Sequence, residues 1–99
     1  MRPPRIEWRA AARADLLAII AYVADDNPDV AQLLKNDIEA KVGRLTAHPK
    51  LYRGGRVLGT REMVVRGNYI VVYAEAPAAL MILRILHGAQ KWPVSDEGE

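Results

Sequence analysis

The sequence lacks several residue types on which common kinds of protein site depend. Its 99 residues include no cysteine and no phenylalanine, and its one serine is Ser95. Without cysteine the chain cannot form a disulfide, a thiolate metal site or a cysteine nucleophile, which fits a reducing compartment. The position of Ser95 in a polar tail argues against a serine hydrolase. The two histidines, His48 and His87, are far apart and lack metal-ligand spacing, so we expect no metal site.

Long apolar runs and nucleotide-binding motifs are also missing. No apolar stretch approaches the ~20 residues of a transmembrane helix, and the start of the chain, residues 1–5, does not resemble a signal peptide. Residues 54–59 include three glycines, but we expect no strand before them and no helix after them, so they match neither phosphate-binding motif. We therefore expect one cytoplasmic domain over residues 1–99 without a cofactor, ordered over about 5–93 and with a frayed tail at 94–99.

The chain has enough apolar sequence for a core, and its charge is unevenly distributed. Hydrophobic residues make up 51% of the sequence and charged residues 26%, which is typical of a globular domain. The formal net charge is only +2, but acids predominate in residues 25–39 and bases in residues 50–66. Such runs commonly do no more than solvate a surface. The alternative is a basic edge for an anionic partner, which is a nucleic acid, a ribosome or an acidic peptide.

The spacing of apolar residues predicts a strand, two helices and then three strands. Residues 5–8 alternate in polarity and predict a short strand. Helices are expected at about 10–25 and 28–47, because Asn27-Pro28 suits a helix start. Strands are expected at 60–66, 68–75 and 80–87. The apolar stripes of the two helices are Ala12, Leu16, Ile19, Ile20 and Val23, and then Val30, Leu34, Ile38, Val42 and Leu45.

This order predicts an α+β fold of the form β-α-α-β-β-β. A helical hairpin is expected to cover one face of a small, mainly antiparallel sheet. The last strand is apolar on both alternating sides, which indicates a central position in the sheet. Tyr69 and Tyr73 share a strand side with Val71, so we expect them to pack in the core. The other face of the sheet and its flanking loops are expected to be open to a partner.

RNA cleavage is the enzymatic reaction that the sequence accommodates best. The reaction needs a base for the 2′-hydroxyl, an acid for the leaving oxygen and cations near the phosphorus. The candidates are His87 as general acid or base, Arg61 and Arg84 as phosphate clamps, and Glu62 as a weaker base. Arg84 and His87 are an odd step apart, so a shared cluster needs a bulge or a turn between them. The structural alternatives are a strand-end imidazole bonded to the backbone for His87 and, for Arg61-Glu62, a surface ion pair across neighbouring strands.

Four segments of the chain form a pattern that is characteristic in its order and spacing. They are residues 8–28, which run from Trp8 to Asn27-Pro28, then 59–65, 69–73 (Tyr-Ile-Val-Val-Tyr) and 82–93, which contains Ile85-Leu86-His87. Together these segments, from about Ile6 to Pro93, resemble toxins of the RelE/ParE superfamily. The resemblance implies the same fold and a type II toxin–antitoxin toxin, encoded beside a small antitoxin that wraps and silences it.

The superfamily has a branch of ribosome-dependent mRNA endonucleases, which are RelE-like, and a branch of gyrase poisons, which are ParE-like. RelE-like nucleases typically carry an arginine where this chain has Ile70, and an aliphatic side chain cannot stabilise a phosphorane. They often alternate basic residues along the preceding strand, whereas only Arg61 remains here. The run Ile85-Leu86-His87 is similar to the ParE-like ending, although the continuation at residues 88–92 departs from it.

The resemblance therefore favours a ParE-like growth inhibitor of a plasmid-stabilisation module, without intrinsic catalysis, that acts on DNA gyrase. A RelE-like mRNA endonuclease and a non-toxic peptide-binding module are the alternatives. We expect an antitoxin to form a hetero-oligomer with the chain, docking in a groove beside the helices or at the free sheet edge. Its acidic residues would meet basic side chains of the toxin. The residues expected to bind antitoxin or target are Arg53, Arg56, Arg61, Arg84 and Trp92.

Overall fold

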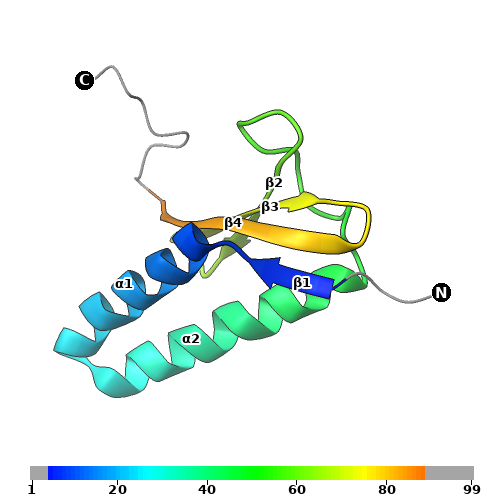
Figure 1. Ribbon diagram of the computed structural model, residues 1–99. Coiled ribbons are helices and arrows are strands. Elements are labelled where there is room, and N and C mark those ends of the chain that lie inside the picture. The colour runs from blue at the N-terminus through cyan, green and yellow to red at the C-terminus, as the bar shows by residue number, and fades with distance from the viewer. Residues whose placement is uncertain (1–4, 89–99) are drawn as a thin grey trace.

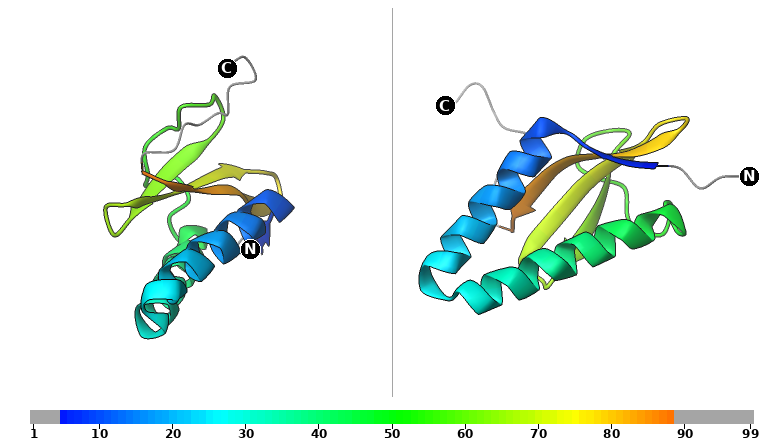
Figure 2. Two further views of the ribbon diagram at one scale, coloured as in Figure 1. Left: turned by 90° about the vertical axis from the view of Figure 1, so that its left-hand side faces the viewer. Right: turned by 60° about the horizontal axis from the view of Figure 1, so that its bottom comes forward.

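The computed structural model describes residues 5–88, which form a helical hairpin packed on a four-stranded sheet. Both helices lie on the same side of the sheet (Figures 1 and 2). This arrangement confirms the expected α+β fold and its element order. The elements are β1 (Arg5–Trp8), α1 (Ala10–Asp26), α2 (Pro28–Gly43), a short 3-10 helix (Arg44–Thr46), β2 (Arg61–Val65), β3 (Tyr69–Glu75) and β4 (Ala79–His87).

The sheet has the strand order β1-β4-β3-β2 and is mixed. β3 is antiparallel to both β2 and β4, whereas β1 pairs with β4 in parallel, from Arg5 opposite Ala79 to Trp8 opposite Ile82. The sheet is therefore mainly antiparallel, with one parallel pair at an edge. β4 lies between two strands, as its apolar residues on both sides predict.

Asn27 forms the whole connection between the two helices. Its backbone N–H donates to the carbonyl oxygen of Val23 and closes α1. Its side-chain oxygen accepts from the N–H groups of Asp29 at 3.1 Å and Val30 at 3.2 Å, which opens α2. Pro28 occupies the first position of α2, where a missing N–H costs no helical hydrogen bond. The Asn27-Pro28 pair therefore ends one helix and begins the next, as predicted.

The main core lies between the sheet and the helical hairpin. Tyr73 and Val71 are fully buried in it and Tyr69 packs against it, which confirms the prediction for the two tyrosines. The prediction for Val30 is wrong, because this side chain is exposed and Ala31 is buried in its place. The end of the hairpin where α1 joins α2 extends past the sheet (Figure 1), so the first turn of α2, which contains Val30, has no strand to cover. The rest of the α2 stripe is buried as predicted, at Leu34, Ile38, Val42 and Leu45.

A β-bulge interrupts the pairing of β4 with β3. The register shifts by one residue at Leu83, between the pairs of Arg84 with Val72 and of Ile82 with Tyr73. Because of the bulge, Ile82 and Ile85 both belong to the helix-facing core although they are three positions apart. Leu83 packs against a second, smaller cluster on the other face of the sheet, formed by Ile70, Val72 and Leu86.

The face of the sheet opposite the helices is partly covered by residues 51–60, which we call the 51–60 loop. The loop rises on the side of the sheet away from the helical hairpin (Figure 1). Beneath it lies Glu62 of β2, which is only 3% exposed. The expectation of an open face is therefore wrong near the start of β2, although Val64 further along the strand is exposed.

Two further expectations concern membrane-spanning helices and the C-terminal tail. Within residues 5–88, no helix is both long enough and apolar enough to cross a membrane. The predicted frayed tail at 94–99 and the candidate contact residue Trp92 lie outside the described residues.

Candidate functional site

The two helices diverge from their joint (Figure 2, right view). A groove lies between them and β1. Its volume is about 520 Å³. Ile6 and Trp8 of β1 contribute apolar surface, and so does Leu17 of α1, which is 69% exposed. A peptide with one apolar side and one polar side suits such a groove. The remaining lining residues are Arg13 and Leu16 of α1 and Lys35, Glu39, Val42 and Gly43 of α2.

The rim of the groove carries charges of both signs. Lys35 Nζ lies 3.0 Å from Glu39 Oε2, one helical turn further along α2. Arg13 of α1 lines the same groove. Ion pairs exposed to this degree contribute little to stability, so these side chains are available to exchange partners.

Glu62 anchors the 51–60 loop from below. Its Oε2 accepts the backbone N–H of Arg56 at 3.0 Å and the Arg56 Nε at 3.2 Å, and its Oε1 accepts from the Arg53 guanidinium at 3.3 Å. Burial opposes ionisation of Glu62, but the bonds from Arg56 and the charge of Arg53 outweigh it and lower the pKa of this carboxyl. The carboxylate is therefore charged at neutral pH and ties the loop to β2.

Backbone contacts complete this anchoring. The N–H of Glu62 donates to the carbonyl oxygen of Arg53, and the N–H of Gly55 donates to the carbonyl oxygen of Thr60 at 2.7 Å. A Cβ atom at Gly55 would lie only 2.2 Å from Thr60 Oγ1, so this close approach requires glycine. The loop therefore has a defined shape in the folded chain.

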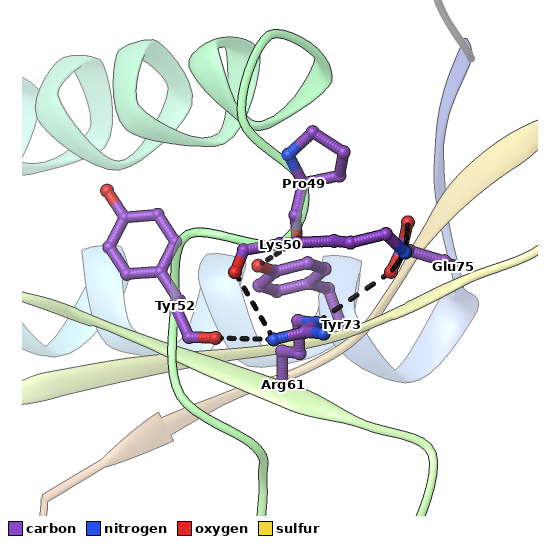
Figure 3. A network of polar contacts seen from close by, with 6 residues as sticks. All are labelled: Pro49, Lys50, Tyr52, Arg61, Tyr73 and Glu75. Carbon is purple, nitrogen blue, oxygen red and sulfur yellow. Dashed lines mark hydrogen bonds and ion pairs between the residues drawn. The ribbon is translucent and has the colours of Figure 1, made fainter.

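A second polar network ties residues 49–52 to the sheet through Arg61 (Figure 3). The Arg61 guanidinium donates to the carbonyl oxygens of Tyr52 at 2.7 Å and Lys50 at 3.4 Å. Its Nε lies 3.7 Å from Glu75 Oε1, which also accepts from Lys50 Nζ at 3.1 Å. Arg61 is thus held by internal partners.

Tyr73 belongs to the same network but is buried. Its hydroxyl donates to the carbonyl oxygen of Pro49 at 2.8 Å (Figure 3). Burial raises the pKa of Tyr73. The positive charge of Arg61 lowers this pKa, and the negative charge of Glu75 raises it, so burial determines the direction. The phenol therefore remains a hydrogen-bond donor at neutral pH and holds the chain after the helices against the sheet.

Arg84 pairs with Asp15 and joins β4 to α1. The Arg84 Nε and one terminal nitrogen lie 2.7 and 2.9 Å from the Asp15 carboxylate. The same carboxylate accepts the backbone N–H of Ile85 at 2.9 Å, beyond the point where β1 ends at Trp8. The bond to Asp15 raises the pKa of Arg84, while partial burial opposes the rise. Asp15 therefore has two roles: it accepts a backbone N–H of β4 that β1 does not reach, and it neutralises the charge of Arg84.

The structure does not bring the four candidate catalytic residues into one cluster. Arg61 lies opposite Tyr73, while His87 lies opposite Tyr69, four residues or about 13 Å away along β3. The β4 bulge precedes Arg84, so no bulge separates Arg84 from His87. The His87 ring contacts the Tyr69 ring edge-on, with centroids 5.7 Å apart. Glu62 is bonded to the loop arginines, whereas Arg61 lies 3.7 Å from Glu75 of β3, so only Arg61 has an ion pair across neighbouring strands.

The predicted binding arginines also have internal partners. Arg53 and Arg56 bind Glu62, Arg61 binds backbone carbonyls and Glu75, and Arg84 binds Asp15. Arg53 and Arg56 nevertheless keep exposed side chains at the surface of the 51–60 loop. They are the members of the predicted set that remain accessible among the residues described.

Two exposed leucines were missed by reasoning from sequence. Leu17 lines the groove although it lies outside the predicted apolar stripe of α1. Leu58 is 100% exposed in the 51–60 loop. Both could have been found in the same way, because each is a large apolar residue at a position that the pattern predicts to be exposed to solvent.

Comparisons with known proteins identify relatives over nearly the whole chain. The family model described as ParE toxin of type II toxin–antitoxin system, parDE, matches residues 6–92. The putative toxin Y4kP of Sinorhizobium fredii is 32% identical over 93 residues, covering 94% of this chain and 97% of its own length. Toxin RelE2 of Caulobacter vibrioides is 32% identical over 87 residues, covering 87% of this chain and 97% of its own.

A solved structure supports the same assignment. A chain of the chromosomal ParDE toxin–antitoxin system from P. aeruginosa matches the fold with a TM-score of 0.75 at 27% identity, covering 86% of this chain and 96% of that chain. The two helices on a mixed four-stranded sheet are shared with that structure. The chain therefore belongs to the ParE toxins of type II toxin–antitoxin systems, which form complexes with a cognate antitoxin.

Proposed function

We propose that this toxin inhibits growth in the cytoplasm by acting on DNA gyrase, and that it does so without a nuclease centre. The observation that carries the proposal is Ile70 of β3, at the position where RelE-like nucleases have an arginine. Ile70 is 9% exposed and packs with Val72 and Leu86. An aliphatic group in an apolar cluster provides no stabilisation for charge that develops on a phosphoryl group.

The contacts of the remaining candidates support the same proposal. Arg84 is bonded to Asp15, and Glu62 is bonded to the loop arginines. Recruiting Arg84 for catalysis would leave the largely buried carboxylate of Asp15 unpaired, which is costly. Glu62 is itself buried under the loop, so its carboxylate is not presented to a substrate. These side chains are therefore better explained as parts of the fold.

An mRNA endonuclease is the second candidate function. The observation in its favour is His87, an exposed imidazole at the end of β4 that packs against Tyr69. Histidine is suited to general acid–base chemistry near neutral pH. One relative also carries the name toxin RelE2.

Two reactions run side by side test the proposal. The purified chain is added to DNA supercoiling by gyrase and, separately, to ribosomes translating a defined mRNA. We expect supercoiling to be inhibited, cleaved DNA to accumulate and the mRNA to stay intact. The His87→Ala variant is expected to inhibit gyrase as the wild type does. Cleavage of the mRNA at discrete codons that disappears in His87→Ala would instead establish the nuclease.

We also propose that the cognate antitoxin silences the toxin by docking in the groove between β1, α1 and α2. The apolar floor, the charged rim and the exposed Leu17 support this placement. Acidic antitoxin residues that approach Arg61 or Arg84 would have to compete with carboxylates already bound there. We therefore assign most of the antitoxin affinity to apolar contacts in the groove.

A further inference from the structure

We propose that the tip of the 51–60 loop, centred on Leu58, is the surface with which this toxin docks on the protein that it inhibits. The partner would supply an apolar socket for Leu58, bordered by acidic side chains. The inference rests on the proposed function, because it assumes that the target is a protein. It adds the part of the toxin that makes the contact and the chemistry of the site that receives it.

Leu58 stands out by its complete exposure. Its side chain is 100% exposed, and it is followed by Gly59, whose φ of +86° turns the chain sharply. Single exposed apolar residues are common on protein surfaces and by themselves need no explanation. A second observation is therefore required, and the construction of the loop provides it.

The loop presents Leu58 in a fixed geometry. The Thr60 hydroxyl donates to the carbonyl oxygen of Val57 at 2.6 Å, and the Thr60 N–H donates to the same oxygen, which closes the turn around Leu58. Glu62, below, accepts three hydrogen bonds from Arg53 and Arg56. A preorganised apolar tip loses little conformational freedom when it binds, so most of its burial contributes to affinity.

The charge around the tip indicates what borders the socket. Residues 50–62 and the adjoining end of β3 carry four bases and two acids, a net charge of +2. The four bases are Lys50, Arg53, Arg56 and Arg61, and the two acids are Glu62 and Glu75. Exposed guanidinium groups beside an apolar anchor suit an acidic rim on the partner.

A protein partner fits these features better than a nucleic acid does. The guanidinium groups of Arg53 and Arg56 share their charge with Glu62, so they can border a protein contact but supply too little free charge to hold a row of phosphates. Leu58, at the tip, has no donor or acceptor for a phosphate or a sugar. A fully exposed leucine gains free energy when an apolar pocket of a protein partner removes it from water.

The position of the loop separates this contact from the antitoxin groove. The loop extends from the face of the sheet opposite the helical hairpin, whereas the groove lies between the hairpin and β1 (Figures 1 and 2). A change confined to Leu58 is therefore expected to affect the target and to leave the antitoxin contact intact. This separation makes the proposal testable.

The test compares Leu58→Gln with the matched control Leu33→Gln. Leu33 lies on α2, is 58% exposed and lines none of the groove, so the control changes an exposed leucine in the same way elsewhere. We expect Leu58→Gln to inhibit gyrase supercoiling roughly tenfold to a hundredfold less potently, because a leucine that the complex would bury is replaced by a polar side chain. We expect its thermal midpoint and its affinity for the purified antitoxin to equal those of the wild type, and Leu33→Gln to match the wild type throughout.

Several results would overturn the inference. They are full potency of Leu58→Gln, equal loss in both variants, loss of antitoxin affinity in Leu58→Gln, or a change in its oligomeric state. A wild-type chain that does not inhibit gyrase contradicts the proposed function instead. Growth arrest on expression then tests the inference alone, because Leu58→Gln should still arrest growth less strongly than Leu33→Gln if the loop docks on another protein target.

Discussion

Glu62 shows how one buried carboxylate determines the shape of a surface loop. It lies at the start of β2 under the 51–60 loop and accepts bonds from two arginines of that loop. Its pKa is lower than the ordinary value of 4.5, because the bonds to Arg56 and the charge of Arg53 outweigh the effect of burial. A lowered pKa in the folded chain means that the ionised form stabilises the fold.

We expect Glu62→Gln to destabilise the chain by about 1–3 kcal/mol at pH 7, because the amide loses the charge that Arg53 and Arg56 require. In the wild type this contribution is present above the unfolded-state pKa and is lost as the pH falls through the folded-state pKa. The difference between wild type and variant should therefore shrink below pH 4.5. Urea unfolding of the wild type and of Glu62→Gln at pH 7 and at pH 3.5 measures the difference in the free energy of unfolding at each pH.

The exposed Glu39→Gln is the control for this prediction. Glu39 pairs with Lys35 on the surface of α2, so loss of this ion pair should change the free energy of unfolding by less than about 0.5 kcal/mol. A Glu62→Gln variant with the wild-type dependence on pH would contradict the role given to Glu62.

At this scale the sequence predicted which residue types matter better than it predicted their partners. The sequence predicts an ion pair across neighbouring strands for Arg61-Glu62, and Arg61 does lie beside Glu75 of β3, but Glu62 points to the opposite face of the sheet. Glu62 instead meets Arg53 and Arg56, which the loop folds back over it. That return depends on the close approach of Gly55 to Thr60, which spacing along the chain does not show.

Asn27 acts at the scale of whole elements, because it ends α1 and caps α2. We expect Asn27→Ala to lower the free energy of unfolding by about 1 kcal/mol, since the N–H groups of Asp29 and Val30 lose their acceptor. The opposite change is available at Arg9, which precedes α1 without a side-chain cap. Arg9→Ser is expected to leave the stability unchanged or raise it by up to about 1 kcal/mol.

Denaturant unfolding of both variants measures these effects. Equal unfolding midpoints for Asn27→Ala and the wild type would show that the joint does not depend on its side chain. The side chain of Asn27 caps α2, whereas that of Arg9 does not cap α1. The two variants therefore compare the loss of a cap with the addition of one in the same hairpin.

Most element boundaries were predictable, because they depend on local chemistry. Asn27-Pro28 marks the helical joint, and alternation marks the three later strands. The bulge at Leu83 was not predictable, because residues 80–86 are apolar at almost every position and any register buries them. The exposure of Val30 depends on how far the hairpin extends beyond the sheet, which is a property of the assembled fold.

The groove belongs to the scale of the whole molecule, because β1, α1 and α2 each supply part of it. We expect Leu17→Gln to weaken antitoxin binding by about tenfold or more, since it removes exposed apolar surface from the groove. Inhibition of gyrase by the isolated variant should be unchanged. Titration of labelled antitoxin measures the first quantity, and the supercoiling reaction measures the second.

Leu33→Gln is again the matched control and should bind antitoxin as the wild type does. Unchanged antitoxin affinity in Leu17→Gln would remove the groove as the docking site. Combined with Leu58→Gln, the variant tests separately the surface proposed for the antitoxin and the surface proposed for the target.

The overall architecture was predictable from the order of its elements, but the groove was not. Two helices followed by three strands predict the hairpin on a sheet, and the apolar β4 predicts its central place. The groove exists because β1 runs parallel to β4 and lies beside the hairpin, so that Ile6 and Trp8 face the helices. A four-residue strand carries too little pattern to reveal its direction.

The pairing of β1 with β4 also bears on when a newly made chain becomes harmful. Arg5 pairs with Ala79, so 74 residues of synthesis separate these two partners. At roughly 5–20 residues per second, a ribosome needs about 4–15 seconds to supply the second strand after the first. Until then the centre of the sheet is missing, and a nascent toxin is expected to be inert. Translation itself therefore delays poisoning, and an antitoxin made at the same time has that interval in which to accumulate.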